Sequence, residues 1–260
     1  MSDGEDKRTG FGGLTLGYLA MLPLLLAYEA AVAAAGPDGP RNTAELLVTR
    51  PLAWLGDAQG AVRLVLILLI AVYAFARLRR GPVRIGASLL RVCGEGVAAG
   101  LLLGPLLVLA CAALDVTAAE LHLPTGLSAD PPDLARAARL AGAGAWEEGL
   151  FRVGVYSAAF LLAVRTADFL GLAESPARWA GDAAGLAVSA LAFAALHLAA
   201  FTRVVGVGGE PYDPAVFLWR LLAGLALGVL FRWRGPGVAA WAHALFNLAL
   251  ALGSGPGLFR

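Results

Sequence analysis

Charged residues are scarce in this chain of 260 residues, and that scarcity excludes a soluble globular domain. Only 15% of the residues are Asp, Glu, Lys or Arg, whereas soluble domains carry about 25%. Hydrophobic residues make up 59% of the chain, and the mean hydropathy is +0.73. We therefore predict an integral membrane protein whose main partner is the lipid bilayer. The formal net charge is only +1, so no nucleic-acid partner is expected.

Cysteine is also scarce, which excludes a disulfide framework and a cysteine-based metal finger. The two cysteines, Cys93 and Cys111, lie in one apolar segment, about five helical turns or roughly 27 Å apart on a helix. A disulfide needs Cα atoms within about 7 Å of each other, so these two residues cannot form one.

Long apolar segments dominate what is present. A membrane-spanning helix needs about 20 mostly apolar residues, and seven stretches are candidates: residues 14–35, 61–78, 92–114, 137–164, 183–204, 215–231 and 237–252. None shows the alternation with period two that is typical of membrane β-strands. We predict an all-α fold, a polytopic integral membrane helix bundle of about seven transmembrane helices, forming one membrane domain over residues 1–260.

The ends and connections of these segments predict the topology. No early cleavage signal is evident, so the first segment is expected to stay as a membrane helix. Lys and Arg are more frequent on the side that holds the N-terminus, and residues 77–91 alone supply five of them. This bias predicts a cytoplasmic N-terminus. We expect a multi-pass protein of the plasma membrane. The connections 37–59 and 116–134 are polar, and either could hold a short interfacial helix.

Three polar clusters interrupt the apolar segments. They are Glu147-Glu148-x-x-x-Arg152, Phe193-x-x-x-His197 and His243-x-x-x-Asn247. An acid or an arginine at the centre of a membrane helix costs about 2.5 to 3.5 kcal/mol on insertion scales. Such residues usually face the interior of a bundle and serve a function. We therefore expect the three clusters to be shielded from lipid and to form one site.

The first cluster combines two acids and one cation. Glu148 and Arg152 are four residues apart, so they share a helix face and can pair. Taken alone, this pair could merely fix helix packing. Glu147 points about 100° away and has no local cation. We expect Arg152 to orient Glu148, while Glu147 acts as a general base or acid.

The histidine clusters allow more than one interpretation. A histidine on an apolar helix, such as His197, is often a core residue, and His243 with Asn247 could simply join helices by hydrogen bonds. Imidazole with a carboxamide could instead stabilise an oxyanion. Glu147, His197 and His243 could alternatively form an open site for Zn²⁺ with three ligands. Asn247 is a good hydrogen-bond donor but a poor zinc ligand, which slightly favours a mechanism without metal.

The three motifs, in this order on successive membrane helices, resemble those of the CPBP family of CAAX proteases and bacteriocin-processing enzymes, also called Abi. Its eukaryotic relative is the type II CAAX prenyl endopeptidase. The resemblance covers roughly residues 137–252, in the last four helices, and leaves residues 1–136 as accessory helices. It implies that Glu147 activates water with help from His197. It further implies that His243 and Asn247 stabilise the oxyanion and that Glu148 and Arg152 form a supporting pair.

The resemblance implies an intramembrane endopeptidase. Its substrates would be membrane-associated peptides or lipid-modified proteins of the CAAX type, such as prenylated proteins. A proton-coupled transporter is an alternative, because intramembrane Glu, His and Arg also build proton relays. A non-catalytic membrane scaffold or immunity protein is another.

Overall fold

The computed structural model describes residues 11–36, 39–117, 119–121, 132–203 and 208–253. Helices make up most of them, and an isolated β-bridge joins Leu198 to Glu210. The predicted all-α bundle is therefore confirmed. The helices are, in chain order, α1 Phe11–Ala35, α2 Thr43–Thr49, the 3₁₀-helix η1 Arg50–Ala58, α3 Gln59–Arg79, α4 Ile85–Ala112, α5 Leu134–Glu148, the π-helix η2 Gly149–Tyr156, α6 Ser157–Phe169, α7 Glu174–Ala195, α8 Ala199–Thr202, α9 Pro214–Arg234 and α10 Pro236–Gly253.

Six helical spans among the described residues are long and apolar enough to cross a membrane. The chain is thus an integral multi-pass membrane protein, and six of the seven predicted segments coincide with these spans, with 92–114 extending two residues past Ala112. The fifth prediction, 183–204, was wrong in its bounds. Helix α7 begins earlier, at Glu174, and ends at Ala195, and its first half carries Arg178 and Asp182. Those charges explain why α7 is not among the six spans.

The fourth predicted segment, 137–164, is not one continuous α-helix. The π-helix η2 separates α5 from α6, begins directly after Glu148 and includes Arg152. Its hydrogen bonds skip one residue more than those of an α-helix, and such segments often mark functional sites. The Ser157 hydroxyl donates to the Arg152 carbonyl at 3.2 Å, across this wider turn. Gly149 and Gly154 also weaken the α-helical preference of the segment.

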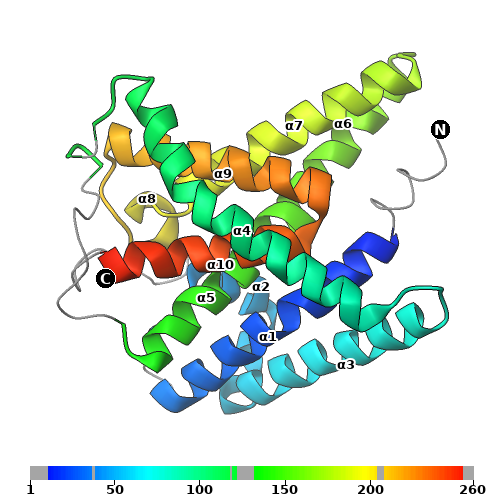
Figure 1. The fold of residues 1–260 in the computed structure, drawn as a ribbon, viewed down its shortest axis with the longest axis vertical. Coiled ribbons are helices and arrows are strands. Elements are labelled where there is room, and N and C mark those ends of the chain that lie inside the picture. The colour runs from blue at the N-terminus through cyan, green and yellow to red at the C-terminus, as the bar shows by residue number, and fades with distance from the viewer. Residues whose placement is uncertain (1–10, 37–38, 118, 122–131, 204–207, 254–260) are drawn as a thin grey trace.

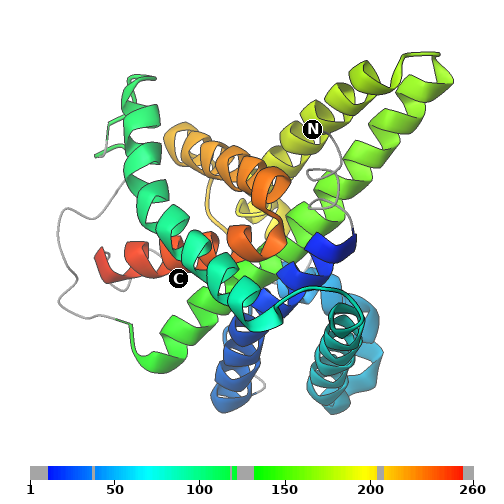
Figure 2. The same cartoon turned by 45° about the vertical axis from the view of Figure 1, so that its right-hand side comes forward.

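Helix α10 lies in the middle of the bundle and is buried along most of its length. It packs against α1, α4, α5 and α9 (Figure 1). Helices α6 and α7 form a hairpin that projects from the bundle in both views (Figure 1, Figure 2). On another side, α1 packs against α3 and α5. The segments that carry the first and third motifs, α5 with η2 and α10, therefore pack against each other.

The connection between α1 and α3 holds the short helix α2, as the sequence allowed. Asn42 caps its N-terminus, because the side-chain oxygen accepts the backbone N–H groups of Ala44 and Glu45. Most of the connection 116–134 lies outside the described residues, so a short helix there stays a prediction.

Two glycines of α5 permit close helix contacts beside the motif. A Cβ atom on Gly142 would lie 2.7 Å from the Leu24 carbonyl oxygen of α1. A Cβ atom on Gly144 would lie 3.0 Å from the Ala244 nitrogen of α10 and 3.2 Å from Cγ of His243. Small residues allow membrane helices to approach in this way. The approach at Gly144 brings His243 within reach of the acids at the end of α5.

This packing makes a prediction for Gly142→Ala. The new methyl group would collide with α1, so we expect a loss of roughly 1 to 3 kcal/mol of stability, as for other overpacked sites. Gly94→Ala is the matched control, because nothing lies within 4 Å of a Cβ atom there. Alanine favours a helix over glycine by up to about 1 kcal/mol, so this variant should not lose stability. Thermal unfolding in detergent compares the two, and equal midpoints would contradict the close contact of α1 with α5.

Candidate active site

The first motif lies where α5 passes into the π-helix η2, deep inside the bundle. Glu148 and Arg152 are 0% exposed, Glu147 is 8% exposed and His243 is 3% exposed. Charged groups this deep in an apolar protein need partners, because an isolated buried charge is very costly. The partners of each group therefore define what the site can do.

Glu148 lies between a cation and an imidazole. Its Oε2 atom is 3.2 Å from Nε of Arg152, and its Oε1 atom is 2.9 Å from Nδ1 of His243. The pair expected from the four-residue spacing is thus present. The Arg152 guanidinium also donates from Nη2 to the Gly224 carbonyl at 3.1 Å and lies 5.2 Å from the centre of the Phe193 ring. Glu148 and Arg152 together hold the His243 ring in place.

Glu147 turns the other way, and its two oxygens have different neighbours. Its Oε2 atom is 3.5 Å from Nε2 of His243. Its Oε1 atom accepts a hydrogen bond of 2.8 Å from Nδ2 of Asn42. Glu147 also lines a polar pocket of about 130 Å³, together with Asn42, His197 and Glu210. Glu147, the first acid of the motif, is therefore the one that faces a space where a small polar molecule fits.

The prediction that His197 lies on a transmembrane helix was wrong. His197 lies in the turn that follows α7. Its ring Nδ1 is 2.8 Å from the Phe193 carbonyl, which a continuing α-helix would bond to the backbone N–H of His197. The side chain thus takes over the helix bond, and the helix ends. Because a carbonyl only accepts, Nδ1 carries the proton, and Nε2 of the neutral ring keeps its lone pair.

Phe193 lies between the two imidazoles and packs against both rings. Its ring centre is 5.0 Å from that of His197 and 5.6 Å from that of His243, both edge to face. The three motifs therefore meet around one phenylalanine ring. The contacts join the end of α7 to α10 and support both imidazoles at the site.

Asn247 is held by α5. Its Nδ2 atom donates to the Leu140 carbonyl at 3.2 Å, which leaves the second N–H of the amide for another acceptor. The structure brings Glu147, Glu148, Arg152 and His243 into direct contact and places His197 at the same pocket. Its contact with Leu140 does not place Asn247 beside Glu147. The role of Asn247 as an oxyanion donor stays a prediction.

The alternative zinc site is not assembled in the described part of the chain. Among the described residues, no three His, Cys, Asp or Glu side chains are grouped so that they could hold a metal ion. Glu147, His197 and His243 thus do not form a site with three ligands.

Sequence reasoning missed Asn42 and Glu210, which also line the polar pocket. The pattern Asn42-x-x-Glu45 is typical of a helix start and could have revealed α2. No local pattern indicates that the Asn42 amide reaches a carboxylate 105 residues further along the chain. Glu210 pairs with Arg220 at 2.6 Å, and its backbone is tied to that of His197.

Fold and site together define a class: a multi-pass helical membrane protein with two buried acids, a guanidinium and an imidazole beside a polar pocket. Residues 134–249 match the family model described as type II CAAX prenyl endopeptidase Rce1-like. The matched segment contains all six predicted site residues, and the resemblance drawn from the three motifs is confirmed. No curated protein and no solved structure matches the chain.

Proposed function

We propose that this protein is an intramembrane endopeptidase of the CAAX protease type, with Glu147 as the general base. The observation that carries the proposal is the placement of Glu147. This buried carboxylate lies 3.5 Å from an imidazole and lines a polar pocket together with a second imidazole. Hydrolysis requires a base within hydrogen-bond reach of a water molecule that is itself close to the scissile peptide bond. Both must be shielded from lipid. The family match over residues 134–249 supports the same reaction. In this proposal, residues 137–252 form the catalytic core and residues 1–136 support it.

In the proposed reaction, Glu147 takes a proton from a water molecule in the polar pocket. The water oxygen then bonds to the carbonyl carbon of the peptide. His197 can accept a hydrogen bond from the second O–H of this water through Nε2, because its Nδ1 proton is engaged with a carbonyl; that hydrogen stays on the water oxygen. When the C–N bond breaks, Glu147 returns its proton to the leaving amine. Atoms and protons balance with water as the only co-reactant.

The oxyanion would be stabilised by His243 and Asn247. His243 donates to Glu148 through Nδ1, so it donates to an oxyanion through Nε2 only when both ring nitrogens carry protons. Arg152 supports this arrangement through Glu148. The two acids of the first motif thus differ in role, since one moves protons and the other orients the imidazole.

A second pocket supports a lipid-modified substrate. It has a volume of about 570 Å³, is lined mostly by apolar side chains of α1, α3 and the π-helix η2, and includes Trp146. Ligand pockets commonly have volumes of about 300 to 1,000 Å³. Trp146 lines this apolar pocket, and its neighbour Glu147 lines the polar one. A lipid chain could thus lie on one side of α5 while the peptide reaches the other.

The test is cleavage of a fluorogenic membrane peptide by the purified protein in lipid vesicles. We expect cleavage, confirmed by mass spectrometry of both products, and faster turnover of a prenylated peptide than of the same peptide without the lipid. No cleavage of either peptide would overturn the proposal. Proton flux that depends on Glu147, without any cleavage, would indicate a transporter instead.

We further propose a plasma-membrane location with the N-terminus in the cytoplasm, which protease protection of a tagged terminus would check.

Metal removal gives an independent prediction. Because Glu147, His197 and His243 do not form a three-ligand site, we expect turnover to persist after treatment with a strong chelator. The measurement is the cleavage rate before and after chelation, with elemental analysis of the same sample. A rate that falls at least tenfold and returns on addition of Zn²⁺ would contradict this prediction.

A further inference from the structure

Glu147 receives a hydrogen bond from a part of the chain that lies outside the matched segment 134–249. The donor is Nδ2 of Asn42, at 2.8 Å from Oε1. Asn42 lies just before α2, and both residues line the polar pocket. The N-terminal region therefore contributes a polar group directly beside the proposed base.

The orientation of the Asn42 amide follows from its other partners. Its side-chain oxygen accepts backbone N–H groups of Ala44 at 2.8 Å and of Glu45 at 3.3 Å. Backbone N–H groups only donate, so the atom facing them is the oxygen and the NH₂ group faces Glu147. The backbone N–H of Asn42 donates to the Tyr28 hydroxyl at 2.7 Å. Asn42 is thus held both at its side-chain oxygen and at its backbone N–H, which fixes the direction of the NH₂ group.

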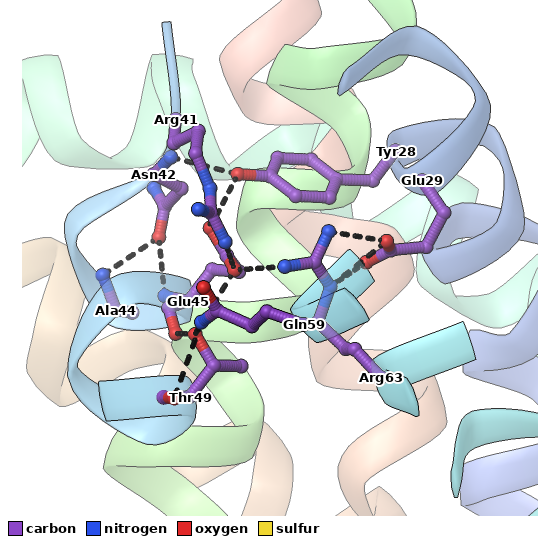
Figure 3. A network of polar contacts seen from close by, with 9 residues as sticks. All are labelled: Tyr28, Glu29, Arg41, Asn42, Ala44, Glu45, Thr49, Gln59 and Arg63. Atoms are coloured by element: carbon purple, nitrogen blue, oxygen red, sulfur yellow. Dashed lines mark hydrogen bonds and ion pairs between the residues drawn. The ribbon is translucent and has the colours of Figure 1, made fainter. Parts of the chain in front are cut away.

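A buried network of ion pairs holds α2 in position (Figure 3). Glu45, which is fully buried, pairs with Arg41 and lies 2.6 Å from Nη1 of Arg63. Arg63 also pairs with Glu29 of α1 at 2.6 Å. Two acids and two guanidinium groups balance each other in charge. The network therefore joins α1, α2 and α3 and leaves the residue that caps α2 little freedom to move.

We propose that Asn42 is a positioning residue for Glu147, an inference that rests on the proposed function. The amide holds Oε1, so that Oε2 is the oxygen directed at His243. A carboxylate bound at one oxygen cannot rotate freely about its last bond. Asn42 therefore fixes the orientation of the Glu147 carboxylate, with Oε1 engaged by the amide and Oε2 left for the water. A misplacement of about 1 Å at a reacting group can cost about 100-fold in rate.

Asn42 also caps a helix, so the test must separate the two roles. Asp and Ser cap helices about as well as Asn, but neither can donate an amide hydrogen to Glu147. We expect Asn42→Ser and Asn42→Asp to lower kcat about 10- to 100-fold, with KM changed less than about twofold because substrate binding is retained. Asn42→Asp should be the slower variant, since it places a second negative charge beside Glu147. If Asn42 acted only as a helix cap, the two variants would have equal kcat values, or Asn42→Asp would be the faster one.

Gln59→Ala is the matched control. Gln59 belongs to the same network through hydrogen bonds to Thr49, and it does not line the polar pocket. This variant should unfold at a slightly lower temperature with unchanged kcat. All variants are measured as full-length protein in lipid vesicles, with thermal unfolding alongside turnover.

The outcomes are distinct. Wild-type cleavage with unchanged kcat in both Asn42 variants would overturn the positioning role and leave the proposed function standing. An equal loss of kcat in Gln59→Ala would overturn it in favour of general support by the network. A wild-type protein that cleaves no peptide would overturn the proposed function and this inference with it. Slow Asn42 variants beside a normal Gln59→Ala would support it.

Discussion

Glu147→Gln is expected to lower kcat for peptide cleavage by about 10²- to 10⁴-fold, the usual contribution of a general base. Glutamine keeps the shape of the side chain and an oxygen that can accept from Asn42. It cannot take up the water proton. The fold should therefore persist, and KM should change little. The measurement is steady-state cleavage of the prenylated peptide in vesicles, with thermal unfolding of the same preparation.

Glu95→Gln is the control for this variant. Glu95 is another carboxylate within an apolar helix, where it pairs with Arg91 and Arg234 on α4 and α9. Glu95 does not line the polar pocket, so kcat of the Glu95→Gln variant should stay near that of the wild type. A Glu147→Gln protein that is folded and cleaves at the wild-type rate would refute Glu147 as the base.

The bundle could be predicted from the sequence because the bilayer imposes a simple rule. Spans must be about 20 residues long and mostly apolar, and α1, α3, α4, α9 and α10 obey it. The bounds of helix α7 were predicted wrongly, because its first half carries Glu174, Arg178 and Asp182. Its end depends on the His197 ring, which competes for a backbone carbonyl. Hydropathy contains no information about such a side-chain contact.

The site was predictable where its parts are close in sequence. The spacing of Glu148 and Arg152 predicts a pair, and the pair is present. The contact of His243 with both acids was not predictable, because it depends on the close approach of α5 and α10 at Gly144. Asn42 was missed for a related reason. Its contact with Glu147 depends on a network of buried charges in which Arg63 pairs with Glu45 and Glu29, 18 and 34 residues away along the chain.

Arg152→Met is expected to destabilise the protein by about 3 to 5 kcal/mol, the cost of leaving a buried charge without its partner. Glu148 is fully buried and would keep only the hydrogen bond from His243. Methionine fills a similar volume, so the effect is one of charge. The double variant Arg152→Met with Glu148→Gln should regain at least half of the loss, because the amide oxygen can still accept from His243. Unfolding in detergent mixtures measures both variants.

The control is a pair with the same spacing on the surface. Arg178 and Glu174 are also four residues apart, and their side chains are 55% and 80% exposed. Exposed pairs contribute about 0 to 1 kcal/mol, so Arg178→Met should have almost no effect. Equal losses in the two methionine variants would show that burial does not set the strength of the pair at Glu148. A double variant no more stable than Arg152→Met would show that Arg152 stabilises the fold through Phe193 and Gly224. In that case its role would be packing rather than holding the acid that orients His243.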